Sequence, residues 1–344
     1  MGTNSRIQKD TCPLRHMLSV LFMQTRTTAQ TQLFVCLCNN VTTHLRWYAY
    51  THLQHCAEAC LFEVVTEWAD TQTTKQTERQ VGRNTHIYHK KNSKMKGKTK
   101  YVAFSTQKGG AGKTTITVLV SSYLHYVKGY NVAVIDCDYP QHSILEMRDR
   151  DLKLAMEDQY YKGLAYEQFT RLNKKAYPVV ESNTKMALAD TEPLLSHVDL
   201  DFIFFDLPGT INDHDLIYTL ARMDYIIAPI SADRVVVEST LNFIVAIKEH
   251  LIDKGKSDIK GLYMLWNMVD GREKSELYEV YEQVMKELGL PILRTFLPDT
   301  KRFRREQSLS RRAVFRSTLF PADKSLLRGS HLEELVDELI ELFK

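Results

Sequence analysis

The chain contains 344 residues, a length typical of about two domains or of one large domain with an appendage. Apolar residues make up 44% and charged residues 25%, and this balance excludes collagen-like, low-complexity and wholly disordered proteins. Lysine and arginine exceed aspartate and glutamate by only 45 to 42, so a basic function has to come from local clustering. No run of about 18 apolar residues occurs, and we therefore expect a cytoplasmic protein without a transmembrane helix.

The first 94 residues differ in composition from the rest. They hold 15 threonines, and 11 lysines and arginines against 6 aspartates and glutamates, whereas the remainder has 34 against 36. Their apolar residues show no sustained period of 2 or 3.6, so the sequence predicts an irregular or disordered segment. We therefore expect a boundary between an N-terminal extension, residues 1–94, and a folded domain, residues 95–344.

Three interpretations of this extension stay open. It could be a small DNA-binding domain, although no pair of capped amphipathic helices is visible. It could be translated sequence upstream of the true start, with Met95 as the initiator, which fits the strand predicted soon after it. It could also bind zinc, but two cysteines and two histidines lie at a spacing that zinc fingers do not prefer: Cys56, Cys60, His52 and His55.

A glycine-rich loop follows the first predicted strand. Residues 101–105 predict a short buried strand, and an amphipathic helix is predicted from Lys113 to a basic last turn and glycine stop at residues 128–129. Between them, residues 107–115 read Gln-Lys-Gly-Gly-Ala-Gly-Lys-Thr-Thr. In this arrangement the backbone N–H groups and the helix N-terminus bind phosphate. Lys113 is expected to reach the β- and γ-phosphates, and the Thr114 hydroxyl to ligate Mg²⁺.

The loop departs from the ordinary pattern, because Gln107 stands where a glycine is expected and an extra lysine, Lys108, follows. In this form it resembles the deviant loop of the ParA/MinD family of P-loop ATPases. The resemblance implies a catalytic role for Lys108, which would reach across an ATP-sandwiched homodimer, and for Lys113. Gly109 would permit the close approach of the two subunits. The ATP-binding residues implied in this loop are Lys108, Gly109, Gly110, Ala111, Gly112, Lys113, Thr114 and Thr115.

Two further motifs put carboxylates at strand ends. Residues 131–135 predict a buried strand that runs into Asp136-Cys-Asp138-Tyr139-Pro-Gln, and residues 201–206 predict another that ends in Asp206. Ligands bind at this end of strands in open α/β sheets, although paired aspartates also occur in solvated turns. By resemblance, Asp138 is catalytic and positions or activates the attacking water, while Asp136 and Asp206 hold Mg²⁺. The inserted Tyr139 leaves the division of roles between Asp136 and Asp138 open.

The remaining strand signals complete a sheet. Residues 225–229 and 262–266 predict two more apolar strands, each preceded by a helical stretch. The pattern predicts an α/β fold: a P-loop NTPase with a mostly parallel, doubly wound sheet flanked by helices. Asn267 resembles the family's adenine-side asparagine, although an asparagine after a strand is also a common turn former. Residues 207–209, Leu-Pro-Gly, match the family's switch segment, which could sense the γ-phosphate.

The C-terminal third contains a basic cluster and an acidic helix. Between Arg294 and Arg328 there are ten lysines and arginines against three acidic residues, which indicates nonspecific DNA binding or a solvated helix face. The last helix, predicted over residues 331–344, has an acidic polar face that anionic lipid would repel, so we expect it to pack on the domain and not on a membrane. The candidate DNA-binding residues are Arg302, Arg304, Arg305, Arg311 and Arg312, with Arg316 in the same cluster.

The resemblance covers residues 98–344 and is nearest to the ParA-like, TraA-type ATPases of conjugative elements, on residues 313–321 and 326–330. It implies an ATPase that uses ATP and Mg²⁺, dimerises on ATP binding, binds nonspecific DNA in the nucleoid and is reset by hydrolysis. The implied partner is a ParB-like or conjugation-associated protein, in plasmid or conjugative-element segregation or transfer. Two alternatives stay open: a P-loop biosynthetic ligase of the dethiobiotin-synthetase type, and an ATP-gated scaffold that does not hydrolyse.

Overall fold

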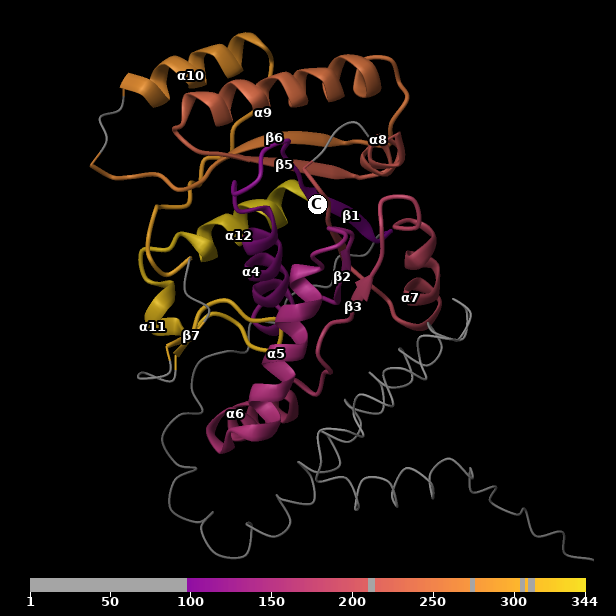
Figure 1. Cartoon of the computed structure of the whole chain (residues 1–344), viewed down its shortest axis with the longest axis vertical. Coiled ribbons are helices and arrows are strands. Elements are labelled where there is room, and N and C mark those ends of the chain that lie inside the picture. The colour runs from indigo at the N-terminus through magenta and orange to yellow at the C-terminus, as the bar shows by residue number, and fades with distance from the viewer. Residues whose placement is uncertain (1–97, 210–213, 273–275, 304–306, 309–312) are drawn as a thin grey trace, which may run out of the picture. The chain divides into compact units, whose positions relative to one another are not determined.

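A parallel β-sheet runs through the centre of the folded domain (Figure 1). The computed structural model describes residues 98–209, 214–272, 276–303, 307–308 and 313–344, so the extension and its boundary at residue 94 lie outside the described residues. Within the described part, six strands form this sheet, and each neighbouring pair is parallel. In spatial order they are β3 (Val179–Glu181), β2 (Val132–Asp136), β4 (Phe202–Asp206), β1 (Lys100–Phe104), β5 (Tyr225–Ile230) and β6 (Gly261–Trp266).

Helices cover both faces of the sheet, which confirms the predicted doubly wound α/β fold. One face packs against α4 (Lys113–Tyr126), α5 (Ser143–Glu157) and α12 (Leu332–Leu342). The other packs against α8 (His214–Ala221), α9 (Arg234–Ile247) and α10 (Glu276–Glu287). The remaining described elements are α6 (Gln159–Leu172), the 3₁₀-helix Ala189–Thr191, α7 (Glu192–His197), the π-helix Lys248–Ile252, α11 (Lys324–Leu327) and the antiparallel pair β7 (Gln307–Ser308) and β8 (Ala313–Val314).

The strands are buried on both faces, which explains why they read as short continuous apolar runs. In β4, Phe202 and Phe204 join the core on the α4 side, while Ile203 and Phe205 join the core on the α9 side. Successive side chains of a strand point to opposite faces, so a single strand contributes to both cores. This arrangement leaves only the strand ends available for a polar site.

The last helix, α12, packs on the domain as predicted. Leu335 and Leu339 are fully buried, and the ring of Phe343 lies 4.5 Å from that of Tyr225. Its acidic face is used within the chain, since Lys128 of the turn after α4 forms a 2.5 Å ion pair with Asp337. The helix therefore closes one face of the sheet through both its apolar and its polar side chains.

The strand order creates a crevice at the carboxyl ends of β1 and β4. The chain passes from β1 through α4 to β2 on one side, and from β4 through α8 to β5 on the other. Connections that diverge in this way leave the loops after these strands free to bind a ligand between them. In the β2–β4 register Asp136 lies directly beside Asp206, so two carboxylates meet at this edge.

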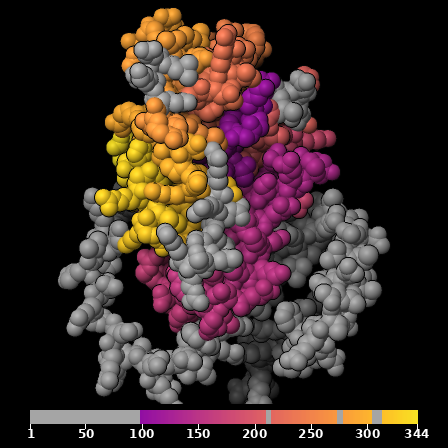
Figure 2. Space-filling model, turned by 60° about the vertical axis from the view of Figure 1, so that its left-hand side comes forward, coloured from indigo at the N-terminus to yellow at the C-terminus, as the bar shows by residue number. Residues whose placement is uncertain are grey.

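The segment after α10 returns past the opening of this crevice and packs on the helices after β2. In the space-filling view the yellow C-terminal region borders the magenta α5–α6 region (Figure 2). Gln168 of α6 donates a 2.7 Å hydrogen bond to the carbonyl of Leu319, and Phe320 packs with Tyr161. The C-terminal residues 313–322 are thereby held against α5 and α6.

Candidate nucleotide-binding site

The glycine-rich loop connects the end of β1 to the first turn of α4. Gly110 and Gly112 have φ values of 78° and 88°, a left-handed conformation in which a side chain is strained. The N–H of Ile116 donates to the carbonyl of Gly112 and closes the first helical turn. The N–H groups before Ile116 have no intrahelical acceptor, and together with the helix dipole they attract an anion.

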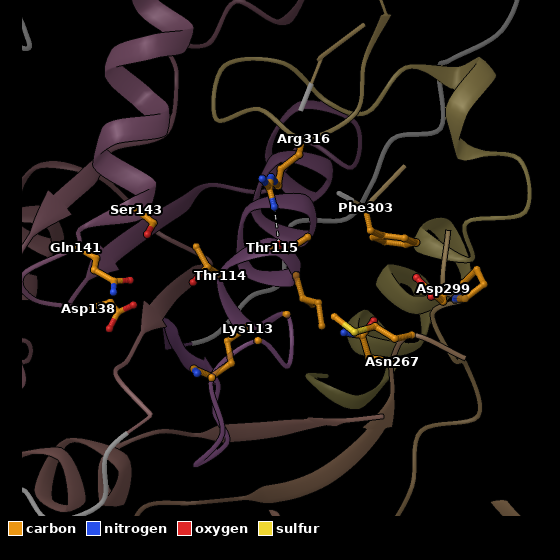
Figure 3. A pocket seen from close by; sticks show the side chains of 16 residues that line it. Lys113, Thr114, Thr115, Asp138, Gln141, Ser143, Asn267, Asp299, Phe303 and Arg316 are labelled. Carbon is orange, nitrogen blue, oxygen red and sulfur yellow. Dashed lines mark hydrogen bonds between the residues drawn. The ribbon is translucent and has the colours of Figure 1, made fainter. Parts of the chain in front are cut away.

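A cavity of about 360 Å³ opens over this loop (Figure 3). Lys113, Thr114 and Asp138 lie toward one end of it, and Asn267 and Asp299 toward the other. It has the size of a small-molecule site. The lining residues are Gly109, Gly110, Gly112, Lys113, Thr114, Thr115, Ile116, Asp138, Gln141, Ser143, Asn267, Met268, Pro298, Asp299, Phe303 and Arg316.

Asp206 marks a place for a cation. Its Oδ2 accepts a 2.8 Å hydrogen bond from the hydroxyl of Thr114, but its buried Oδ1 has no hydrogen-bond partner among the described residues. Burial, followed by the nearby carboxylates, raises the pKa of Asp206 to about 7. Burial also lowers the pKa of Lys113, against the attraction of Asp206 and Asp138. An orphaned carboxylate oxygen beside a threonine hydroxyl fits the oxygen ligand set of Mg²⁺.

The two aspartates after β2 have different surroundings. Asp136 is fully buried, and its Oδ2 accepts from the backbone N–H groups of Ile144 and Leu145, at 2.9 and 3.1 Å. Burial nevertheless raises the pKa of this carboxyl. Asp136 therefore anchors the first turn of α5, whereas Asp138 is half-buried and faces the cavity. The inserted Tyr139 is 72% exposed and lies outside the cavity lining.

Asn267 joins the far end of the cavity to the phosphate loop. It follows β6, is buried, and its Nδ2 donates a 2.8 Å hydrogen bond to the carbonyl of Ala111. A Cβ on Gly112 would lie 2.6 Å from the same Nδ2, so the loop needs glycine there for space as well as for its φ angle. Asn267 thus fixes the loop while it lines the cavity.

Residues 102–311 match the model of the CobQ/CobB/MinD/ParA nucleotide binding domain, a match that spans more than half of the chain. The chain belongs to this family. The predicted ParA/MinD resemblance is therefore confirmed, and the cavity over the glycine-rich loop is the candidate site for the nucleotide of this domain.

Individual proteins show the same likeness at low identity. An uncharacterized protein of Borreliella burgdorferi, BBD21, is 25% identical over 253 residues, covering 68% of this chain and 97% of that protein. The Pyrococcus furiosus cell division ATPase MinD is 18% identical, covers 71% of this chain and 100% of its own, and has a TM-score of 0.46. A plasmid partition protein from Borrelia burgdorferi is 16% identical, with a TM-score of 0.41 over 72% of this chain and 98% of its own. The assignment rests on the family model.

Lys108 is the extra lysine of this ParA/MinD-type loop. It is not among the described residues that line the cavity. It is exposed, and its carbonyl accepts a 3.5 Å hydrogen bond from Lys113 Nζ. A Cβ on the neighbouring Gly109 would meet no atom within 4 Å. The roles expected of Lys108 and Gly109 toward a second subunit therefore stay predictions.

The predicted DNA-binding cluster is described only in part. Arg302 is half-buried, and its Nη1 donates to the carbonyls of Leu326, at 2.9 Å, and Arg328. Its guanidinium therefore has a structural use at the end of α11. The other four candidates, Arg304, Arg305, Arg311 and Arg312, lie outside the described residues.

The sequence reasoning missed part of the cavity lining. Gln141 ends the acidic motif after β2, so its place beside Asp138 could have been inferred. Phe303 and Arg316 come from a region that the sequence indicated only as basic, and no motif marked either as a cavity residue. Their position results from chain folding over long sequence separations.

Other site types receive no support among the residues that the structure describes. Among the described residues no cluster of three or more histidines, cysteines, aspartates or glutamates could hold a metal ion, and Cys137 is buried as a free thiol. The zinc alternative, on Cys56 and Cys60, lies outside the described residues. None of the described helices combines the length and apolar character needed to cross a membrane.

Proposed function

We propose that the protein is a Mg²⁺-dependent ATPase that dimerises on binding ATP, binds nonspecific DNA in that state and is reset by hydrolysis. The observation that carries the proposal is the meeting of Lys113, Thr114 and Asp138 in one cavity above a ParA/MinD-type loop, with the buried Asp206 hydrogen-bonded to Thr114. The role of the protein would be to segregate or transfer a plasmid or conjugative element. A ParB-like or conjugation-associated protein would stimulate hydrolysis, and the complex would lie in the cytoplasm on the nucleoid.

The chemistry of phosphoryl transfer requires charge neutralisation and a positioned water. The N–H groups at the start of α4 and the ammonium of Lys113 would hold the β- and γ-phosphates. Bound Mg²⁺, held by Thr114 and Asp206, would supply further positive charge at these oxygens. Asp138, on the opposite side of the cavity from Asn267, is the carboxylate available to position or activate the attacking water.

The segment after β4 supports a coupling between ATP hydrolysis and the conformation of the phosphate loop and α9. A Cβ on Gly209 would lie 3.0 Å from the carbonyl of Gln107, so the Leu207–Gly209 turn packs tightly against the start of the phosphate loop. Gln107 in turn accepts a 3.3 Å hydrogen bond from Ser239 of α9. Loss of the γ-phosphate would change the loop, and these contacts would transmit that change to α9.

The switch is tested with the full chain in Mg²⁺ and either ATP or ADP, by sizing and by binding to a mixed-sequence DNA duplex. ATP is expected to give a dimer that binds DNA, whereas ADP is not. Lys108→Ala is expected to remain monomeric in ATP, because the cation offered to the partner's phosphate is lost. Lys256→Ala, at an exposed lysine away from the loop, is the matched control and should behave like the native chain.

Two outcomes would overturn the proposal in different ways. A protein that binds ATP, stays monomeric and ignores DNA would favour a small-molecule ligase of the dethiobiotin-synthetase type. A protein that dimerises and binds DNA in ATP, but releases no phosphate whether DNA is present or absent, would favour the nonhydrolysing scaffold. Phosphate release measured on the same samples separates these outcomes.

A further inference from the structure

Arg316 enters the nucleotide cavity from the C-terminal segment. It follows β8 and is half-buried, and its Nη1 donates a 2.6 Å hydrogen bond to the hydroxyl oxygen of Thr115 (Figure 3). The sequence grouped this arginine with a basic surface cluster, but the folded chain turns it inward. A guanidinium that lines the cavity next to the phosphate loop is suited to bind an anion there.

The position of Arg316 along the cavity indicates which part of a nucleotide it meets. Asp138 lies near one end of the cavity and Asn267 near the other, while Thr115 and Arg316 lie between them (Figure 3). Lys113, at the Asp138 end, is the cation for the terminal phosphates. A nucleotide that runs from Lys113 to Asn267 would bring its α-phosphate to the middle of the cavity.

We propose that Arg316, together with Thr115, binds the α-phosphate of the nucleotide. Because the Thr115 oxygen accepts from the guanidinium, its own O–H remains available to donate to a phosphate oxygen. ATP and ADP both carry an α-phosphate, so the contact raises the affinity for both nucleotides and does not discriminate between them. The inference rests on the nucleotide binding of the proposed function, but not on dimerisation or DNA.

A buried network holds the segment that presents Arg316. Asp151 of α5 is fully buried, and its Oδ2 accepts from the Ser317 hydroxyl at 2.8 Å and from the Thr318 N–H at 2.7 Å. Arg148, one turn earlier, donates from Nε to the Thr318 hydroxyl at 3.0 Å. Ser317 and Thr318 directly follow Arg316, so α5 fixes the backbone from which Arg316 projects. Asp151 is therefore a positioning residue for the same contact.

The first test measures ATP and ADP dissociation constants of the full chain in Mg²⁺. Arg316→Gln is expected to weaken both by the same factor, about tenfold to a hundredfold, as for loss of a charged hydrogen bond. Arg222→Gln removes a surface arginine, paired with Asp258, and should change neither. A loss for ATP alone would assign Arg316 to the γ-phosphate, and no loss would make its role structural; either result overturns the proposal.

A second test separates the α-phosphate from the rest of the nucleotide. ADP with sulfur in place of one non-bridging α-oxygen is compared with ADP, using both diastereomers. At least one diastereomer is expected to bind the native chain more weakly than ADP does. This sulfur gap, the ratio of the dissociation constants of the analogue and of ADP, should be smaller in Arg316→Gln. An equal gap in both proteins, or no gap in the native chain, would overturn the assignment.

The positioning role of Asp151 is tested by a double variant. Asp151→Asn should weaken ADP binding and reduce the sulfur gap, and Asp151→Asn with Arg316→Gln should bind ADP as Arg316→Gln does alone. Additive losses would remove Asp151 from this contact. A native chain that binds ATP and ADP but binds no DNA in the presence of ATP would defeat the proposed DNA function while leaving the Arg316 assignment intact. A native chain that binds neither ATP nor ADP would defeat both.

Discussion

The two ends of the nucleotide cavity are built differently. The phosphate end uses one contiguous stretch, residues 109–115, and Asp138 after β2, with Asp206 at the end of β4 hydrogen-bonded to Thr114. The other end collects Asn267, Asp299 and Phe303 from segments after β6, and Arg316 enters between the two ends. Phosphate recognition needs one backbone conformation and a helix N-terminus, whereas a slot for the rest of the nucleotide can be lined by many combinations of side chains.

The two ends also differ in whether they bury charged side chains at a cost in free energy. At the phosphate end burial opposes the charge of both Asp206 and Lys113, because it raises the pKa of the first and lowers that of the second. At the other end Asn267 has its hydrogen bond, and the ring of Phe303 packs edge-on against Phe315 at 5.2 Å. The phosphate end is therefore organised for charges that a ligand brings, and the largest effects of substitution are expected there.

Lys113→Ala should have the largest effect on the reaction. The substitution removes the half-buried cation that is expected to face the terminal phosphates, and loss of one such group costs on the order of a thousandfold in kcat. ATP turnover in Mg²⁺ measures it, with Lys256→Ala as the control for removal of a lysine. A decrease of less than tenfold would mean that the helix N-terminus and the metal carry the charge without Lys113.

Asp206→Asn should stabilise the nucleotide-free protein while abolishing turnover. Burial disfavours the carboxylate, and a neutral amide of the same shape relieves about 1.4 kcal/mol for each pKa unit by which burial shifts the group. The urea midpoint at pH 8 in a chelator should rise, whereas Asp258→Asn, at an exposed ion pair, should leave it nearly unchanged. A lower midpoint for Asp206→Asn would show that the carboxylate is stabilising without a cation.

The predictability of the fold and the site follows the same division. The strands over 131–135, 201–206, 225–229 and 262–266 could be predicted because fully buried strands are short apolar runs. The phosphate loop could be predicted because its glycines and lysine serve one local geometry. By contrast, β3 is only three residues long, and Arg316 reaches Thr115 across 201 positions of sequence, so neither leaves a local pattern.

Gly112→Ala tests the contact that joins the two ends. Alanine at a φ of 88° is strained, and its Cβ would also meet Asn267 Nδ2 at 2.6 Å. Gly129→Ala is the matched control, since its φ is 82° but its Cβ would meet nothing within 4 Å. Strain in the left-handed backbone should lower the free energy of unfolding of both variants by about 1–2 kcal/mol. The clash with Asn267 should lower that of Gly112→Ala by about 1–3 kcal/mol more, as urea unfolding of both variants would measure. Equal losses would mean that Asn267 moves away freely.

His125 gives a measure of acid sensitivity unrelated to the nucleotide, because it lies at the opposite end of α4 from Lys113. Its buried ring donates from Nε2 to the Lys175 carbonyl and accepts at Nδ1 from the Val132 N–H, so it has to be neutral. Burial, and then Lys174, lower the pKa of His125 to about 3. The unfolded chain takes up the proton below pH 6.5, so the free energy of unfolding should fall by about 1.4 kcal/mol per pH unit between pH 6.5 and 3.

Unfolding free energies at pH 7, 6 and 5 measure this slope without nucleotide. His125→Gln keeps a donor and an acceptor but cannot be protonated, so its slope should be smaller by the stated amount. The same slope in both proteins would assign the acid sensitivity to other groups.

Phe303→Ala should have the smallest effect on ATP turnover. Unlike Lys113→Ala, it should change KM and not kcat. The ring lines the cavity away from the reacting phosphates, so it contacts the nucleotide equally before and during hydrolysis. Loss of this apolar contact, worth about 1 kcal/mol, should raise KM for ATP roughly fivefold and leave kcat unchanged. A fall in kcat at constant KM would mean that this end of the cavity also holds the phosphates in their reactive position, and the separation of the two ends would then fail.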